Sequence, residues 1–205
     1  MKERDFTGII PVQYTGAEIE ADAFVDLKDD NEAKKFYEVV KERLLRVNNW
    51  HKIAGIISAK FKITDAKGNE VERNVQKGDY FKIDIPGPGS SEGDGYDWVC
   101  VEDVKEVFDE DMQSTGFRVR PGQNPLGKKN ETAHFYSGEA TSSFIVTREG
   151  TRIKAWIVDR NIKPNIHADS LTDKIRDSAI GIGAIGMFSK VQWKGLAQGL
   201  VKKDD

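Results

Sequence analysis

The sequence contains a single cysteine, Cys100, among its 205 residues, which excludes an internal disulfide. Its place within Trp98-Val99-Cys100-Val101 indicates a buried structural thiol. Long apolar runs are lacking too, since the longest, Ala179 to Phe188, is far shorter than the about 20 residues that cross a bilayer. The charged start, residues 1–6, is not typical of a signal peptide. These absences predict a cytoplasmic protein without a membrane span.

An excess of positive charge is also missing. The chain has 31 Lys and Arg against 34 Asp and Glu, a net charge of −3, and the two signs are interleaved. The one skewed stretch, Glu102 to Asp111, is acidic. Proteins that bind nucleic acid concentrate Lys and Arg on one face, so we expect no nucleic-acid partner.

Catalytic and ligand signatures are scarce, because no GxSxG, P-loop or CxxC motif is present. The three histidines, His51, His134 and His167, lack metal-binding spacing. Gly181 to Gly186 spells GxGxxG, but it follows a helical pattern instead of a strand, which favours helix packing or a kink over a nucleotide site. The loop from Ser90 to Asp97 holds three carboxylates without EF-hand spacing. We therefore predict no cofactor and no metal, and assign no catalytic residue.

Two segments near the N-terminus have clear periodicity. Glu18 to Leu27 alternates apolar and polar residues, which predicts a half-buried strand. Asn31 to Val47 carries apolar residues at spacings of three and four after Asp29-Asp30, a pair able to cap a helix. This pattern predicts an amphipathic helix, and Gly55 ends the helical pattern that continues beyond it.

From Ile56 to about Lys163 the period changes to two, which predicts an antiparallel meander. The expected strands start with Ala59–Thr64, Glu70–Val75 and Tyr80–Ile85, continue with Tyr96–Val107 and Thr115–Arg120, and finish with a hairpin of Thr141–Thr147 and Arg152–Asp159.

The C-terminal part returns to a helical pattern after Asp169 or Ser170. Leu171 to Ile182 forms one apolar stripe, and the glycine cluster that follows predicts a kink or break, since each Gly inside a helix costs about 1 kcal/mol relative to Ala. Ser189 then caps a second helix, Val191 to Val201.

The order of elements resembles the helix-grip fold of the START and polyketide-cyclase-like superfamily over Glu18 to Val201. The resemblance depends on that order and on Asn31 to Gly55, where the helix after the first strand ends in Trp50 and Ile53-Ala54-Gly55. It implies an α+β fold in which a curved antiparallel sheet wraps around a long C-terminal helical segment. A cystatin-like or nuclear-transport-factor-like cone is the alternative, and the strong helical signal after the sheet disfavours it.

One domain is expected over residues 1–205. It would comprise a loose N-terminal segment at 1–17, a strand, helix and meander at 18–168, and the C-terminal helical segment at 169–201.

Aromatic residues of the meander supply the remaining functional signal. They either fill the core or line a cavity between the sheet and the C-terminal helix, where a pocket needs apolar walls. Phe81, Phe117 and Phe144 are the predicted inner-face residues, and Trp98 and Trp156 join the ligand-binding set if their faces are reversed, because a one-residue change of register exchanges the faces.

The leading hypothesis, which comes from the resemblance, is a protein that binds a small apolar or amphipathic ligand. The first alternative is a protein-interaction or regulatory module with a solid core, using Glu102–Asp111 or the helix Val191–Val201. The second is a cyclase- or hydratase-like enzyme with His51, His134 or Asp97 inside a pocket. No protein partner is identified.

Overall fold

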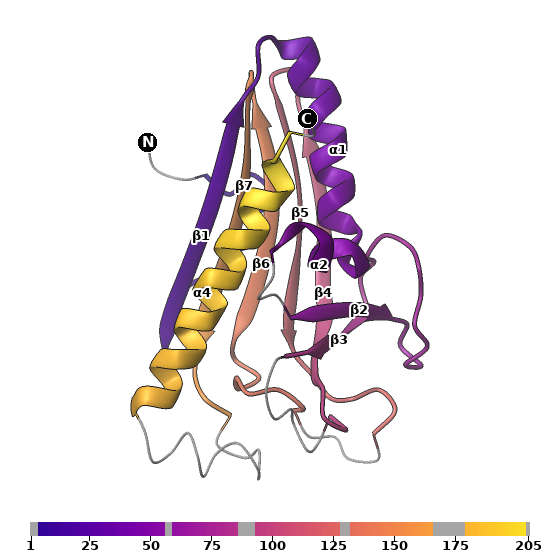
Figure 1. Cartoon of the computed structure of the whole chain (residues 1–205), viewed down its shortest axis with the longest axis vertical. Helices are drawn as coiled ribbons and strands as arrows, with labels where there is room; N and C mark the ends of the chain where they lie inside the picture. Colours follow the sequence, from indigo (N-terminus) through magenta and orange to yellow (C-terminus); the bar gives the residue numbers. More distant parts are fainter. Residues whose placement is uncertain (1–3, 56–58, 86–92, 128–131, 166–178, 204–205) are drawn as a thin grey trace.

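The computed structural model describes residues 4–55, 59–85, 93–127, 132–165 and 179–203 (Figure 1). It contains a seven-stranded sheet and helices that lie on one face of that sheet. The strands are β1 (Ala17–Asp26), β2 (Lys60–Thr64), β3 (Tyr80–Asp84), β4 (Asp97–Phe108), β5 (Met112–Pro121), β6 (Thr141–Glu149) and β7 (Arg152–Ile162). The helices are α1 (Asp30–Leu45), a 3-10 turn (Val47–Asn49), α2 (Trp50–Ile53) and α4 (Ala179–Val201).

The sheet is antiparallel throughout, with the strand order β1-β7-β6-β5-β4-β3-β2. It curves, and α1, α2 and α4 occupy its concave side (Figure 1). Consecutive strands from β2 to β7 are neighbours, whereas β1 pairs with the last strand. The predicted fold class, a curved antiparallel sheet packed around a C-terminal helix, is confirmed.

Helix α1 forms where the apolar spacing predicted it. The Asp29 side chain accepts a hydrogen bond from the Glu32 backbone N–H at 2.8 Å and so caps the first turn. The buried stripe of the helix has a spacing of three or four residues and consists of Ala33, Tyr37, Val40 and Leu44. This stripe fixes α1 against the concave face.

The prediction of a return strand at Glu70–Val75 was wrong. Glu70 makes a single bridge with Thr64, and β3 is the strand that pairs with β2. The segment turns because Asp79, which is buried, accepts two hydrogen bonds from the Arg73 guanidinium, at 2.7 and 2.8 Å. Side-chain bonds of this kind stabilise a compact turn in place of a ladder. The β6–β7 hairpin, by contrast, forms around Gly150 as predicted, with φ at +56°.

The predicted break at the glycine cluster was also wrong, since α4 runs without interruption from Ala179 to Val201. The first part of the predicted C-terminal helical stripe, residues 171–178, lies outside the described residues. Two later glycines have a packing role: a Cβ at Gly195 or Gly199 would overlap the carbonyl oxygens of Ala54 and Ile53, respectively. Lack of a side chain therefore lets α4 contact the end of α2 directly.

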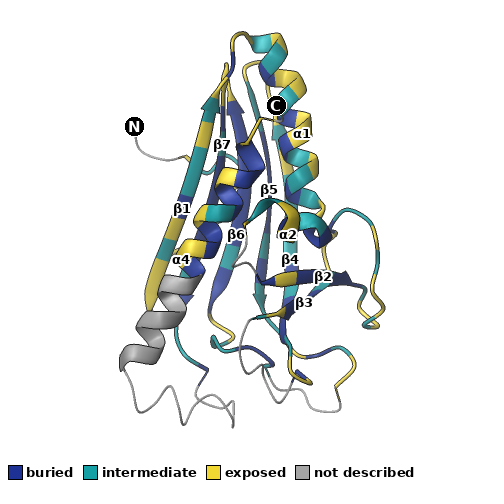
Figure 2. Ribbon diagram, in the orientation of Figure 1, coloured by how far each residue is buried: buried dark blue, intermediate teal, exposed yellow. Residues whose placement is uncertain are grey.

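Aromatic rings fill the centre of the concave side between the sheet and α4. Trp50 of α2 is 1% exposed and lies 4.9 Å from Phe144 and 5.3 Å from Phe61, measured between ring centroids. The cluster consists of Trp50, Phe61, Phe81, Phe117, Phe144 and Trp193. The facing surfaces of β5, β6 and α4 are accordingly buried (Figure 2).

The N-terminal strap, residues 4–16, crosses the opposite, convex face of the sheet. Ile10 of the strap packs on Ile145, Trp156 and Val158, which point to that side. Asn161 of β7 adopts a left-handed conformation, with φ at +57°, and its side-chain oxygen accepts the strap's backbone N–H groups at 2.9 and 3.2 Å. The convex face is thus partly covered by the chain itself.

Candidate functional site

The structure divides the five predicted ligand-binding aromatic residues between the two faces of the sheet. Phe81, Phe117 and Phe144 lie together on the concave face, with Phe117 stacked 5.1 Å from Phe144. Trp98 faces away from that cluster and donates its indole N–H to the Gly93 carbonyl at 3.2 Å. Trp156 lies on the convex face under the strap. Contact of any of the five with a ligand stays a prediction.

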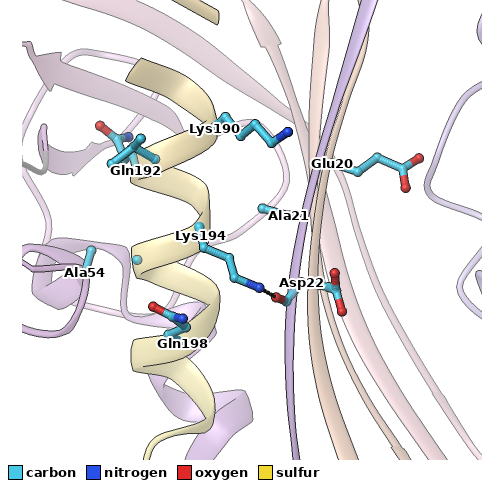
Figure 3. Close-up of a pocket in the computed structure, with 10 residues that line it drawn as sticks. Glu20, Ala21, Asp22, Ala54, Lys190, Gln192, Lys194 and Gln198 are labelled. Carbon is cyan, nitrogen blue, oxygen red and sulfur yellow. Dashed lines mark hydrogen bonds between the residues drawn. The ribbon is translucent and has the colours of Figure 1, made fainter. Parts of the chain in front are cut away.

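An open groove of about 750 Å³ runs between β1 and α4 (Figure 3). Its walls come from β1, from Ala54 after α2, and from the outward face of α4. The lining residues are Glu20, Ala21, Asp22, Ala54, Lys190, Val191, Gln192, Lys194, Gly195 and Gln198. The volume falls within the about 300–1,000 Å³ of small-molecule sites.

The groove has an apolar floor. Ala21, Ala54 and Gly195 leave space in the groove because their side chains are small or absent. Val191 adds a branched apolar side chain that is 60% exposed. An exposed valine beside small residues offers surface that a bound apolar group can remove from water.

Two lysines supply the groove's positive charge. Lys190 and Lys194 extend from α4 toward β1, and the Lys194 ammonium donates to the Asp22 backbone carbonyl at 2.6 Å (Figure 3). The carboxylates of Glu20 and Asp22 point away from α4 in the same view. They pair on the far side of β1 with cations of β7, Arg160 at 2.6 Å and Lys154 at 3.7 Å. Positive charge therefore faces the groove from α4, while the negative charge of β1 lies outside it.

A second group of polar residues is buried at the opposite end of the sheet from the β6–β7 hairpin. The indole N–H of Trp193 donates to Asp159 at 2.8 Å, and the Tyr136 and Ser189 hydroxyl groups lie 3.4 Å apart. Burial raises the pKa of Asp159 to about 6, although bonds from Ser142 and Trp193 oppose the shift. These contacts join β7, α4 and the segment before β6.

Two of the three residues of the enzyme hypothesis lie at this same end. Asp97 is buried and accepts a hydrogen bond from the Phe135 backbone N–H at 3.1 Å, and burial raises its pKa to about 7. His134 accepts one from the Tyr136 backbone N–H at Nδ1, and burial lowers its pKa to about 3, so the ring is neutral. His51 is exposed on α2. Asp97 and the residues around His134 are therefore in contact at one end of the sheet, and His51 lies elsewhere, on α2.

The first half of the acidic stretch of the interaction hypothesis is paired with cations. Glu102 binds Arg118 at 2.7 Å and Arg120 at 2.5 Å, and Glu106 pairs with Lys41 of α1. The two arginines hold the pKa of Glu102 below its usual value even though burial opposes them. The stretch thus contributes less free negative charge than its sequence suggests.

Sequence reasoning missed Asp159, Tyr136 and the groove lysines. A single aspartate within an alternating strand, or a lysine on an amphipathic helix, has no distinguishing pattern, since such residues normally face water. Within the ranges that the structure describes, no cluster of three or more His, Cys, Asp or Glu residues suited to a metal ion occurs. No described helix is both long and apolar enough to cross a membrane.

No protein-family model and no curated protein matches the sequence. Several solved structures have a similar backbone arrangement at low sequence identity. A hypothetical protein of Helicobacter pylori is 12% identical, with 94% of this chain and 98% of that chain covered and a TM-score of 0.49. The major latex-like protein 151 of Panax ginseng is 13% identical (85% and 97% covered, TM-score 0.37). Truncated norcoclaurine synthase from Thalictrum flavum is 11% identical (90% and 96% covered, TM-score 0.36).

Proposed function

We propose that the protein binds a small amphipathic ligand in the groove between β1 and α4. The observation that carries this proposal is an open groove of about 750 Å³ that combines an apolar floor with two ammonium groups. The apolar part of the ligand lies over Ala21, Ala54 and Val191. An anionic head group lies between Lys190 and Lys194, where no carboxylate of β1 competes for them.

The expected energetics divide between the two parts of the ligand. Full burial of an exposed valine side chain contributes about 1.5–3 kcal/mol, so covering the 60% of Val191 that is exposed contributes about 1–2 kcal/mol. An exposed ion pair contributes about 0.2–1 kcal/mol, so each lysine adds a smaller amount and selects the sign of the head group. Specificity for an anion therefore comes from Lys190 and Lys194, and most of the affinity from the floor.

The test is a fluorescence titration with a dansylated medium-chain fatty acid, competed by dodecanoate and by the uncharged dodecanol. Val191→Glu should weaken binding of the probe by at least about tenfold, since it places a carboxylate on the floor. Lys190→Gln and Lys194→Gln should each weaken dodecanoate by about two- to fivefold and leave dodecanol unchanged.

The matched control is Val12→Glu. Val12 belongs to the strap on the convex face and is 79% exposed, so the same change there should leave binding intact. Absence of saturable binding by wild-type protein, or equal weakening by Val191→Glu and Val12→Glu, would refute the groove as the binding site.

A further inference from the structure

The free edge of β1 forms one wall of the groove through its main chain. Glu20 and Asp22 line the groove, yet their carboxylates point away from α4 (Figure 3). These two residues therefore present mainly backbone to the groove. The Lys194 ammonium contacts one of these backbone groups, since it donates to the Asp22 carbonyl oxygen at 2.6 Å.

The register of β1 with β7 determines which backbone groups face the groove. The Leu27 N–H donates to the Thr151 carbonyl at 2.9 Å, which continues the β1–β7 register past the end of the strand. In an antiparallel pair, residues that exchange hydrogen bonds with the partner strand alternate with residues whose N–H and C=O point the other way. The odd-numbered residues of 21–27 therefore bond to β7. The N–H and C=O groups of Glu20 and Asp22 point to the free edge.

In the part of the chain that the structure describes, no strand pairs with this edge of β1. An open edge is a template for further main-chain hydrogen bonds, and many peptide ligands bind proteins by adding to one. The Asp22 carbonyl has two lone pairs, so it can accept a second hydrogen bond beside that of Lys194. The groove thus offers a donor and an acceptor next to its apolar floor and its ammonium groups.

We infer that the groove selects N-acyl amino acids, in which a secondary amide separates the acyl chain from the carboxylate. This inference rests on the proposed function and specifies the ligand class of the same site. The N–H and the carboxyl group of an amino acid point to one side, as they do in a strand. The ligand therefore donates its N–H to the Asp22 carbonyl and accepts the Asp22 N–H at a carboxylate oxygen, as one residue of an added strand does.

The rest of such a ligand fits the other features of the groove. Its acyl chain lies over the apolar floor at Val191, and the second carboxylate oxygen faces Lys190 and Lys194. Hydrogen bonds to a charged group are stronger than those between neutral groups, so the carboxylate is the better acceptor for a backbone N–H. A simple fatty acid uses the ammonium groups and the floor but has no N–H for the Asp22 carbonyl.

Competition against the dansylated probe on the wild-type protein tests recognition of the amide. N-dodecanoylglycine is compared with its ester analogue, dodecanoyloxyacetate, which keeps the chain length and charge but has an oxygen in place of the N–H. One net hydrogen bond corresponds to about three- to tenfold in affinity, so the amide should compete at a concentration lower by that factor. Equal competition by amide and ester would overturn the inference, and binding of dodecanoate would still support the proposed function.

Amide hydrogen exchange at single-residue resolution locates the contact without a variant. Saturating N-dodecanoylglycine should slow exchange of the Asp22 N–H by about tenfold or more. The Phe24 N–H is the matched control, because it points to the same edge but Phe24 does not line the groove, and its exchange should stay unchanged. Equal effects at Asp22 and Phe24, or none at either, would overturn the inference. Failure of the probe, dodecanoate and N-dodecanoylglycine alike to bind would instead refute the proposed function on which it rests.

Discussion

Replacing Phe117 with alanine tests whether the centre of the molecule is a packed core. Phe117 is fully buried and lies within 6.0 Å of Trp50, 5.8 Å of Phe81 and 5.1 Å of Phe144, measured between ring centroids. Rings on three sides cannot collapse into the space that a phenyl group leaves. We therefore expect the variant to lose the transfer free energy of the ring and to gain a cavity.

The expected cost is about 3–5 kcal/mol, the usual range for Phe→Ala in a packed core. For a chain of 150–250 residues each kcal/mol lowers Tm by about 2–4 °C, so Tm should fall by roughly 6–20 °C. Since domains are commonly stable by only about 5–15 kcal/mol, this loss is a large share of the total free energy of unfolding.

Urea unfolding followed by circular dichroism measures this free energy, and a thermal scan measures Tm. Phe108→Ala is the control of the same chemistry, since Phe108 is 80% exposed and should change stability by no more than about 0.5 kcal/mol. A loss below about 1 kcal/mol for Phe117→Ala would refute the packed-core reasoning. It would favour a cavity in which Phe117 is a ligand contact.

Three further predictions concern other parts of the fold. Gly199→Ala should destabilise by about 1–2 kcal/mol, since overpacking against the Ile53 carbonyl outweighs the gain in helix propensity of about 1 kcal/mol; a rise in the urea midpoint would contradict it. Arg148→Met should cost about 2 kcal/mol, because the buried guanidinium donates to Gln113 at 2.7 Å; a change under about 0.5 kcal/mol in urea unfolding would count against this. The pKa of Asp97 is raised to about 7 in the folded protein, whereas the unfolded chain releases this proton near pH 4. The free energy of unfolding therefore falls as pH rises from about 4 to about 7. Asp97→Asn should therefore gain stability relative to wild type across that interval, and a difference in unfolding free energy that does not vary with pH would be incompatible with it.

Periodicity predicted most strands and α1 because burial on one face imposes it. Phe81 and Phe117 were placed correctly on the concave face, since polar residues, Lys82 and Arg118, follow them in their strands. Phe144 lies on the same face opposite Phe117, although the apolar Ile145 follows it. Trp156 was left open because Ala155 and Ile157 on its two sides are apolar, and Trp98 because the apolar run Val99-Cys100-Val101 follows it. A strand covered on both faces has no alternation that marks its inner side.

Tertiary contacts overrode local propensity where predictions failed. Glycine propensity predicted a break in α4, yet the helix continues, because helix formation in proteins depends more on packing than on propensity. The groove was beyond prediction for another reason. Its two walls, Ala21 and Lys194, are far apart in sequence, and only the assembled fold determines that their side chains share a surface.

The buried polar residues at the end of the sheet could not be predicted from the sequence either. Asp159 occupies a position of β7 that alternation makes inward-facing, which in sequence looks like an ordinary defect in an apolar pattern. Its meaning depends on Trp193, whose indole N–H the fold brings to the carboxyl group. Residue type alone could not distinguish a buried carboxyl group from a solvated one.

The pairing of β1 with β7 has a consequence for the order in which the chain assembles. The bonds that hold β1 and the strap to β7 join residues 126 to 149 positions apart, such as Arg152 with Asp26 and Asn161 with Val12. At about 5–20 residues per second, synthesis delivers β7 roughly 6 to 30 seconds after β1 has been made. During this interval β1 lacks β7, its strand partner in the described sheet, and its acidic residues, Glu18, Glu20, Asp22 and Asp26, disfavour pairing with other strands until β7 is made.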